Sequence, residues 1–425
     1  MNIWLMTVGE PLPTEGAEKR LWRTGLLARM LADKGHKVVW WTSSVNHFQK
    51  TLHVQASDRV RIDSHLDIQF LHGPLYTRNI SVRRFWNHWV LGREFRRLSV
   101  AQQKPDLILC SLPTLELSEE AVKFGRESGV PVLIDIRDRW PDELASALPG
   151  PLSRIAPLLL FPMFAQARRA LSGATGIVAI SKSYLDWGLK LAGRHQHGDD
   201  AIFTHGYPRS AAAPLPRDEI DARLRKIGID PDKKLIWFIG TFVGSIDLST
   251  VISAARLLQE QGRDDLQFVL SGEGQDAARY RSEAEGLHNL AFTGWIDKRD
   301  IEALSQSAWA GLAAYKKGAL MSLTNKVFEY LSSGTPLLIS LKGEAEKIVT
   351  DNACGLAYEA GVPASLAAAV ADITADKTSR DIMSGNARAL FEQEYDAGNV
   401  YSKMIEFMES VAARADQARA PAGNR

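Results

Sequence analysis

Residues 323–339 read LTNKVFEYLSSGTPLLI and predict a helix that leads into a buried strand. Val327 and Leu331 lie four residues apart, which is the spacing of one helix face, and Gly334 ends the pattern. The apolar residues 337–339 follow as a short strand. A helix followed so closely by a buried strand indicates one step of an α/β domain.

Two charged side chains lie near the start of this predicted helix. A helix start presents unpaired N–H groups and a partial positive charge, so it stabilises phosphate oxygens, and Lys326 adds a full charge. Glu329, three residues later on nearly the same face, is acceptor-only when ionised and can hold two sugar hydroxyls. The pair predicts a site for an anionic, hydroxyl-rich ligand. The alternative is a Lys–Glu pair on a solvated helix face.

The composition is that of a soluble globular protein. The 425 residues suffice for two or three domains, and 45% hydrophobic and 24% charged residues are ordinary values. The formal net charge of +1 gives no support to nucleic-acid binding. Cys110 and Cys354 both lie in apolar contexts, so we expect core thiols in a reducing compartment, without a disulfide framework or a zinc site.

The first residues, MNIWLMTVGE, lack a basic leader, and their apolar run is too short for a signal peptide. No stretch has the uninterrupted apolar length needed to cross a bilayer. We therefore expect a cytoplasmic protein that meets a membrane, if at all, from its surface.

Short apolar runs alternate with helical patterns along the chain. This alternation predicts two parallel sheets with helices on both faces, in which ligands lie beyond the carboxyl ends of the strands. A stretch rich in Gly, Pro and charge separates the halves at 206–232, so we expect domains at 1–205 and 233–395, a helix at 396–411 and a frayed tail at 412–425. The predicted strands are 3–8, 38–42, 107–110, 132–136 and 177–180, then 235–239, 268–271, 290–292, 310–314 and 337–340.

Several short motifs occur in an order and at a spacing that are together specific. They are GEPLPTEGAEKRLWRTGLLARMLADKGHKV, LIDIRDRWPDEL, IVAISKSY, FIGTF, SGEGQ, FTGWIDKRDIEAL, TNKVFEYLSSGTPLLI and NACGLAY. Over nearly its whole length the chain resembles the retaining, nucleotide-sugar-dependent glycosyltransferases of family 4, which have the two-domain GT-B fold. It is most similar to bacterial members that build surface polysaccharides, in which DIRD followed by WPD or WPE recurs.

The resemblance gives the two charged residues separate roles. It implies that Lys326 meets the donor diphosphate and that Glu329 holds the nucleotide ribose. Relatives have a second glutamate eight positions before the first, assigned to hydroxyls of the transferred sugar, and this chain has Met321 there. Backbone amides near Ser322 and Leu323 are an alternative sugar contact, and Met321 itself is most simply a packing residue.

The resemblance also implies a C-terminal donor-binding domain and an N-terminal acceptor-side domain that face each other across a cleft, with a final helix that can return to the N-terminal domain. Thr241 and Gly244 lie in a loop where relatives often have basic residues for the diphosphate, and this loop has none. An ordinary loop glycine is the alternative for Gly16, and a core aromatic is the alternative for Trp295. The further donor-binding candidates are Gly16, Thr241, Gly272, Glu273, Trp295, Ile296 and Asn325.

Asp135, Arg137 and Asp138 follow a predicted strand and are expected at the carboxyl edge of the first sheet. Relatives often have histidine where Arg137 lies. We expect Arg137 to stabilise the departing diphosphate and Asp138 to accept the proton of the acceptor hydroxyl. The alternative is an ion-pair cluster that only ties down a loop. The resemblance points away from a metal site, so no cofactor beyond the nucleotide-sugar is expected.

Residues 76–97 combine arginines with aromatic residues, which suits contact with anionic lipid head groups, and 151–164 add apolar surface. The alternative is a solvated basic helix with a buried aromatic side. The membrane-side or acceptor-side candidates are Arg83, Arg84, Trp86 and Trp89.

Together these patterns predict a retaining glycosyltransferase that moves a sugar from a nucleotide diphosphate-sugar to a hydroxyl of a lipid-linked saccharide in surface polysaccharide synthesis. The protein is expected in the cytoplasm, with peripheral contact to the inner face of the membrane. Two alternatives stay open: a nucleotide-sugar epimerase of the same fold, and a catalytically silent paralogue that binds nucleotide-sugar in a polysaccharide assembly complex.

Overall fold

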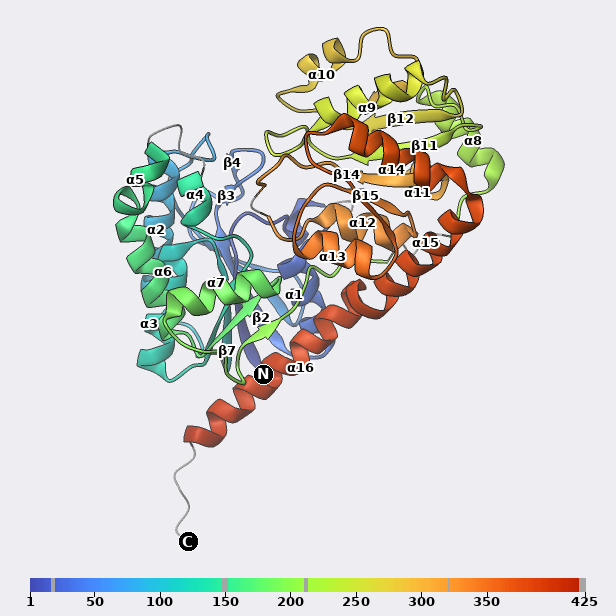
Figure 1. Ribbon diagram of the computed structural model, residues 1–425. Coiled ribbons are helices and arrows are strands. Elements are labelled where there is room, and N and C mark those ends of the chain that lie inside the picture. Colours follow the sequence, from blue (N-terminus) through green and yellow to red (C-terminus); the bar gives the residue numbers. More distant parts are fainter. Residues whose placement is uncertain (17–19, 147–151, 210–212, 320, 420–425) are drawn as a thin grey trace. The chain divides into compact units, whose positions relative to one another are not determined.

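The computed structural model describes residues 1–16, 20–146, 152–209, 213–319 and 321–419, and the chain forms two compact units (Figure 1). Unit 1 comprises Met1–His205 and Val400–Arg425, and unit 2 comprises Gly206–Asn399. Each unit has its own, mostly parallel, β-sheet flanked by helices. The predicted class, α/β with two Rossmann-like domains, is confirmed.

The sheet of unit 1 has eight strands in the order β10-β9-β8-β7-β1-β2-β6-β5, and all neighbours are parallel except β5 and β6. A two-stranded antiparallel ribbon follows β2. The strands are β1 (Asn2–Met6), β2 (Lys37–Ser43), β3 (Val45–Asn46), β4 (Thr51–Leu52), β5 (Arg59–Arg61), β6 (Leu66–Leu71), β7 (Leu107–Leu112), β8 (Val132–Ile136), β9 (Gly176–Ala179) and β10 (Ala201–Ile202).

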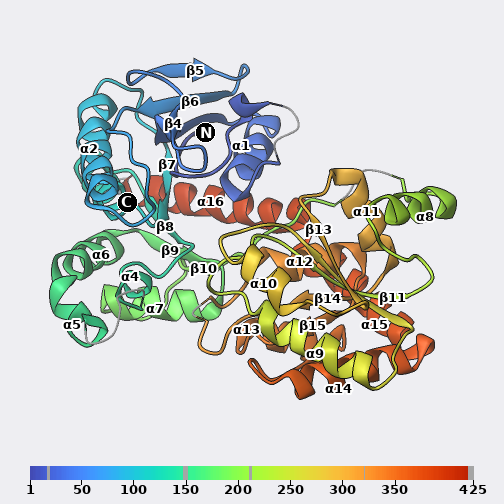
Figure 2. The ribbon, with the colours of Figure 1, turned by 90° about the horizontal axis from the view of Figure 1, so that it is seen from above.

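Helices cover both faces of this sheet, which is why its strands are continuous apolar runs. Trp4 and Trp41 pack on one face against helices α2 and α3, and Figure 2 shows α2 and α1 on opposite sides of the strands. The helices of unit 1 are α1 (Arg23–Asp33), α2 (Val82–Ser99), α3 (Leu115–Ser128), α4 (Asp142–Ser146), α5 (Leu152–Leu159), α6 (Phe161–Gly173), α7 (Lys182–Ala192) and most of α16 (Ala397–Arg419), with the short 3-10 helix η1 (Pro13–Glu15).

The sheet of unit 2 has six parallel strands in the order β13-β12-β11-β14-β15-β16. These are β11 (Lys234–Ile239), β12 (Leu266–Ser271), β13 (Leu290–Gly294), β14 (Ala308–Ala313), β15 (Leu337–Ile339) and β16 (Gly355–Ala357). The helices are α8 (Arg217–Lys226), α9 (Leu248–Glu260), α10 (Ala277–Glu283), α11 (Lys298–Ser307), α12 (Asn325–Ser333), α13 (Glu344–Asp351), α14 (Pro363–Ala375), α15 (Lys377–Leu390) and the π-helical turn η2 (Phe391–Tyr395).

Two expected segments differ from the structure. Residues 206–232 are not only a linker, because they include α8 and bury Leu215, Ile220 and Leu224 in the core of unit 2. The expected frayed tail is also wrong for residues 412–419, because α16 continues to Arg419 and buries Ala412. Residues 420–425 lie outside the described part of the chain.

Helix α12 is fixed to the end of β11 by one buried phenol. The Tyr330 hydroxyl donates to the Trp237 carbonyl at 3.0 Å and accepts from the Ile239 N–H at 3.2 Å. Strand β14 pairs with β11 only as far as Trp237. Beyond that residue, the Tyr330 hydroxyl takes the place of the backbone hydrogen bonds that β14 would have made to β11. Gly311 leaves room for the ring, since a Cβ there would lie 2.4 Å from Tyr330.

We predict that Tyr330→Phe lowers the free energy of unfolding of unit 2 by roughly 1–3 kcal/mol, because it leaves a buried N–H and a buried carbonyl without a partner. Urea denaturation followed by tryptophan fluorescence measures the change. Ser332→Ala is the matched control, since within the described residues that hydroxyl of the same helix bonds only to the Glu329 carbonyl one turn earlier. Equal stability of the two variants would contradict the role of the phenol.

Candidate functional site

Three loops meet at the carboxyl edge of the unit 2 sheet. The Gly240 N–H donates to the Ser271 carbonyl at 2.9 Å, and the Gly272 N–H donates to the Gly294 carbonyl at 2.8 Å. Gly240 and Gly272 have φ values of +142° and +134°, and a Cβ on Gly272 would lie 2.1 Å from the Gly240 carbonyl oxygen. Glycine is therefore required at both positions, and backbone lines this edge.

The side chain of Lys326 contacts the end of β11, next to these loops. Its Nζ donates to the Ile239 carbonyl at 2.6 Å and lies 4.7 Å from the centre of the Phe238 ring. Among the described residues this carbonyl is its one hydrogen-bond acceptor, so two of its three N–H groups are available to a ligand. Burial lowers the pKa of Lys326 to about 8, and the charge of Glu329 opposes that shift. A bound anion would stabilise the ammonium form further.

Glu329 lies one turn after Lys326 and is half-buried. Its carboxylate accepts from the Tyr207 hydroxyl at 3.2 Å. The backbone of Tyr207 is held beside η2, because its N–H donates to the Tyr395 carbonyl and its carbonyl accepts from the Ala397 N–H. Lys326 and Glu329 thus lie together at the start of α12 as predicted from the sequence, and neither bonds to the other within the described residues.

The remaining donor-side candidates lie at the same edge with different environments. Glu273 pairs with Arg281, whose guanidinium lies 5.5 Å from the Phe292 ring centre. Trp295 is 68% exposed, so the alternative of a core aromatic is wrong. Met321 packs partly against the core, as the packing alternative expects. The other candidates are Thr241 and Asn325, which are exposed, and Ile296, which is half-buried.

Gly16 belongs to unit 1, where it follows η1 with φ +111°. A Cβ added to Gly16 would meet none of the described atoms within 4 Å. A side chain at this position would therefore meet no steric clash, although the backbone conformation favours glycine.

A buried ionic network lies at the carboxyl edge of the unit 1 sheet. Asp135 accepts from Arg23 through both oxygens, at 2.9 and 3.0 Å, and from Arg137 at 2.8 Å. Arg137 also pairs with Glu10 and donates to the Thr24 hydroxyl at 2.9 Å. All three guanidinium nitrogens of Arg137 therefore form hydrogen bonds within this network, as expected if the cluster ties down the loop. Its role toward a leaving diphosphate stays a prediction.

Charge balance in this network is nearly complete. Burial alone would raise the pKa of Asp135, but the positive charges of Arg23 and Arg137 lower it to about 2. Burial similarly opposes the charged form of Arg137, and Asp135 and Glu10 nevertheless raise its pKa. The network thus holds ionised groups in a dry environment because each carboxylate is paired.

Asp138, two residues beyond the end of β8, differs in its charge state from the paired groups. Burial raises its pKa to about 7, and the negative charge of Glu143 adds to this shift, while Arg137 and Arg84 oppose it. Asp138 therefore changes charge near neutral pH. This is the property expected of a general base, and the assignment of that role stays a prediction.

Several residues in these clusters escaped the sequence analysis. Glu10 follows Gly9 directly after β1, which marks it as an edge residue, but its partner Arg137 is 127 positions away. Arg23 and Tyr330 gave no separate signal, because each acts through a contact between distant segments.

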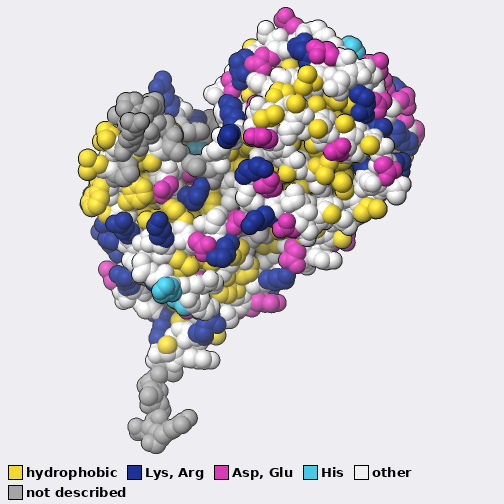
Figure 3. Space-filling view, viewed as in Figure 1, with side chains coloured by type: hydrophobic (Ala, Val, Ile, Leu, Met, Phe, Trp, Pro, Cys, Tyr) yellow, Lys and Arg dark blue, Asp and Glu magenta, His cyan; other side chains and the backbone are white. Residues whose placement is uncertain are grey.

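The expected membrane-side residues divide into two groups. Trp86 and Trp89 are 53% and 49% exposed, and Arg83 is exposed beside them. Arg84 instead turns inward, with its guanidinium 4.9 Å from the Trp140 ring centre. In Figure 3 apolar side chains gather over α5 and α6 at the left edge of unit 1, above Lys and Arg side chains; the exposed ones include Ile155, Leu158, Leu159 and Phe161.

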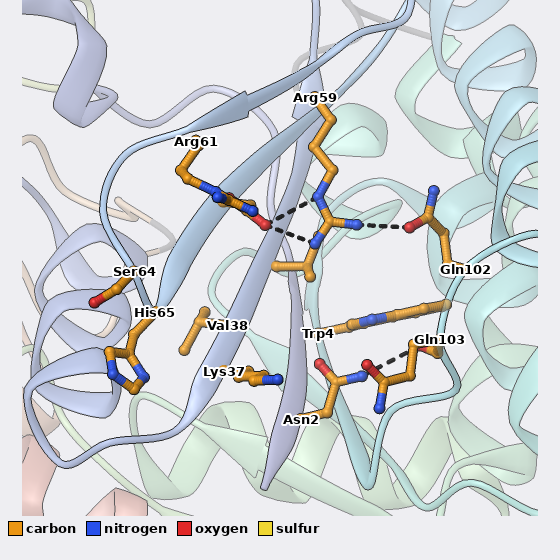
Figure 4. A pocket seen from close by; sticks show the side chains of 12 residues that line it. Asn2, Trp4, Lys37, Val38, Arg59, Arg61, Ser64, His65, Gln102 and Gln103 are labelled. Carbon is orange, nitrogen blue, oxygen red and sulfur yellow. Dashed lines mark hydrogen bonds and ion pairs between the residues drawn. The ribbon is translucent and has the colours of Figure 1, made fainter.

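A separate pocket of ≈230 Å³ lies at the amino ends of β1, β2 and β6 (Figure 4). Arg59 crosses it, donating to Asp67 at 2.7 and 3.0 Å and to Gln102 at 2.6 Å. Ligands of open α/β sheets bind at the other edge, so this pocket is not the candidate site. None of the described helices is long and apolar enough to span a membrane.

Known proteins are similar to this chain in sequence and in fold. Residues 219–390 match the family described as glycosyl transferases group 1. An uncharacterized glycosyltransferase of Methanocaldococcus jannaschii is 23% identical over 184 residues, which are 43% of this chain and 46% of that protein. The match therefore spans about half the length of that relative. The part of the chain that is similar to glycosyl transferases group 1 therefore lies within unit 2.

Solved structures match over nearly the whole chain. HepE of Anabaena in complex with UDP has a TM-score of 0.68 at 14% identity, covering 96% of this chain and 99% of its own. Sucrose-phosphate synthase of Thermosynechococcus elongatus has a TM-score of 0.73 at 16% identity, covering 97% and 99%. WaaG, a glycosyltransferase involved in lipopolysaccharide biosynthesis, has a TM-score of 0.63 at 15% identity, covering 98% and 99%. These likenesses establish the fold, which is GT-B.

We predict that Asp135→Asn flattens the acid dependence of stability. Because the folded state lowers the pKa of Asp135 to about 2, its ionised form stabilises the protein above about pH 4, and this contribution of about 2 kcal/mol is lost as the pH falls toward 2. Urea denaturation between pH 6 and pH 2.5 measures the slope. Asp186→Asn, an exposed carboxylate of the same unit, is the control and should keep the wild-type slope. A wild-type slope in Asp135→Asn would contradict the assignment.

Proposed function

We propose that this protein is a retaining glycosyltransferase of family 4 that transfers a sugar from a nucleotide diphosphate-sugar to a hydroxyl of a lipid-linked saccharide in surface polysaccharide synthesis. The observation that carries the proposal is the paired placement of Lys326 and Glu329 at the start of α12, beside the glycine loops, within the matched glycosyltransferase domain. HepE, among the structures of the same fold, was solved with UDP, with UDP and glucose, and with UDP-glucose.

Each contact assigned to the donor follows from the chemistry of the group. The ammonium of Lys326 and the N–H groups at the start of α12 stabilise the negative charge that develops on the departing diphosphate. Glu329 accepts hydrogen bonds from the ribose hydroxyls, with Tyr207 setting the orientation of the carboxylate. The glycine loops let the ligand approach the backbone closely. With this positive charge supplied by the protein, the proposed reaction requires no metal cofactor.

On the acceptor side we propose that Asp138 accepts the proton of the attacking hydroxyl. A retaining enzyme of this kind needs no protein nucleophile, because the acceptor attacks on the face that the diphosphate leaves. Because all three guanidinium nitrogens of Arg137 are hydrogen-bonded within unit 1, we propose that it also positions the loop that carries Asp138.

We further place the protein at the inner face of the cell membrane. The exposed Trp86 and Trp89, with Arg83, form a basic and aromatic surface on α2 that suits anionic lipid head groups. The apolar side chains exposed on α5 and α6 add to this surface.

Glu329→Ala tests the donor assignment. We expect about ten- to a hundredfold weaker binding of nucleotide diphosphate-sugar, because a charge-assisted hydrogen bond contributes roughly 1.5–3 kcal/mol. Calorimetry against a panel of nucleotide-sugars measures affinity, and nucleotide release measures turnover. Glu260→Ala, an exposed carboxylate at the far end of α9, is the matched control. Unchanged affinity and turnover in Glu329→Ala would refute the ribose contact.

The same release assay separates the proposed activity from its alternatives. Release that requires a membrane extract supports transfer, and stronger release with anionic than with neutral vesicles supports membrane contact. Turnover of the sugar without acceptor would instead indicate an epimerase. Binding of the nucleotide-sugar without any release would indicate a silent paralogue.

The proton assignment predicts a pH profile. Since Asp138 must be ionised to accept a proton, kcat/KM should rise with pH up to about 7 and then level off. Asp138→Asn should lower kcat/KM by about 10²–10⁴-fold and remove this limb. Glu143→Gln should keep the limb but move it to lower pH, because it removes a negative charge that raises the pKa of Asp138. If kcat/KM of Asp138→Asn still rose with pH up to about 7, the assignment would be contradicted.

A further inference from the structure

Two basic side chains of unit 1 converge on the same two residues. Lys50 lies 5.1 Å from the centre of the Tyr76 ring and donates to the Asn79 side chain at 2.5 Å. Arg84 lies 6.0 Å from the same ring centre and donates to the Asn79 carbonyl at 2.6 Å. The Tyr76 hydroxyl in turn bonds His47 Nδ1 at 2.8 Å. Segments after β3, before α2 and within α2 therefore build one cluster.

Within the described residues the two cations of the cluster form no close ion pair, and the nearest carboxylate, Asp138, acts on Arg84 only through its charge. No carboxylate of the described residues forms an ion pair with Lys50 or Arg84, whose hydrogen-bond partners are all neutral. The neighbouring ionic network differs in this respect, because Arg23 and Arg137 are both paired with carboxylates. Burying a cation without a partner costs free energy, so a protein that keeps two such groups together is arranged for an anion from outside.

Nearby groups increase the positive potential. The first turn of α2 carries Arg83 and Arg84 and no acidic residue, although a helix start favours negative charge. Burial and the charges of Arg84 and Lys50 lower the pKa of His47 to about 4. Burial, with Arg84 and His47, lowers the pKa of His88 to about 3. Both histidines are neutral at pH 7, so Lys50 and Arg84 give the cluster a charge of two.

We propose that Lys50, Tyr76 and Arg84 form a binding site for a phosphoryl group of the acceptor. A phosphoryl group near pH 7 carries close to two negative charges and several acceptor oxygens, which match two cations better than a single carboxylate does. Asp138 lies near enough for its charge to act on Arg84. The phosphoryl site therefore belongs to the same part of unit 1 as the proposed proton acceptor, and the inference rests on the proposed function.

Binding of simple phosphates to the whole chain tests this site. Inorganic pyrophosphate, farnesyl phosphate and glucose 6-phosphate are titrated by calorimetry, and the His47 ring is followed by NMR. We expect Lys50→Ala and Arg84→Ala to bind pyrophosphate at least tenfold more weakly than the wild type. Arg97→Ala, which removes one charge at the far end of α2, should bind as the wild type does. Lys50 is only half-buried, so Lys50→Ala remains informative if Arg84→Ala does not fold.

The histidine gives a readout that a purely structural role would not move. A bound anion stabilises the imidazolium, so pyrophosphate should raise the pKa of His47, whose surroundings are Lys50, Tyr76, Arg84 and His88. An unchanged pKa of His47 together with equal affinity in Lys50→Ala would overturn the proposal. Tighter binding of farnesyl phosphate than of glucose 6-phosphate supports a lipid phosphate, and the reverse supports a sugar phosphate.

A competition experiment separates this site from the donor site. UDP should neither displace pyrophosphate from this cluster nor bind more weakly to Lys50→Ala. Displacement of pyrophosphate by UDP, lost in Lys50→Ala, would assign the cluster to the donor and overturn the acceptor proposal. Failure of Glu329→Ala to weaken UDP-sugar binding would refute the donor contact while leaving the phosphate result intact, so the two failures are distinguishable.

Discussion

The hydroxyl of Tyr330 is the contact on which the candidate site of unit 2 depends. Strand β14 stops pairing with β11 at Trp237, and without another partner the last backbone groups of β11 would be buried and unsatisfied. The phenol satisfies two of them and, in doing so, sets the rotation of α12. Lys326, one turn before Tyr330 on the same face, is thereby directed at the Ile239 carbonyl. The position of the Lys326 ammonium thus follows from the completion of the hydrogen bonds of a sheet.

Charge is handled in two different ways in unit 1. Around Asp135 every cation has a carboxylate, so the groups stay ionised although they are dry, and the loop after β8 is held rigidly. Around Tyr76 the cations have only neutral partners. The first arrangement is complete without a ligand, and we propose that an anion completes the second. On this proposal the same residue type serves as structure in Arg137 and as recognition in Arg84.

Local patterns in the sequence were sufficient for the architecture and for part of the site. The alternation of apolar runs located ten parallel strands, and the helix start at Lys326 needed only helical spacing and charge. β6 was missed because Asp67 and Gln69 interrupt its apolar run, and α8 was hidden in a Pro-rich stretch. Arg23 pairs with Asp135 from 112 positions away, and Trp237 accepts from Tyr330 across 93 positions, so no local pattern reports these contacts. The inward turn of Arg84 likewise depends on Trp140, which comes from another segment.

Helix α16 has a consequence for the order in which the protein is made. Tyr401, Met404 and Met408 are buried by 99% or more, and they belong to the unit whose sheet begins at residue 2. A ribosome therefore releases all of unit 2 before it releases the last helix of unit 1. Unit 1, although its sheet is synthesised first, therefore lacks α16 until residues 400–419 have left the ribosome, whereas unit 2 can fold as one continuous segment. The half of the molecule that begins first is the half that is finished last.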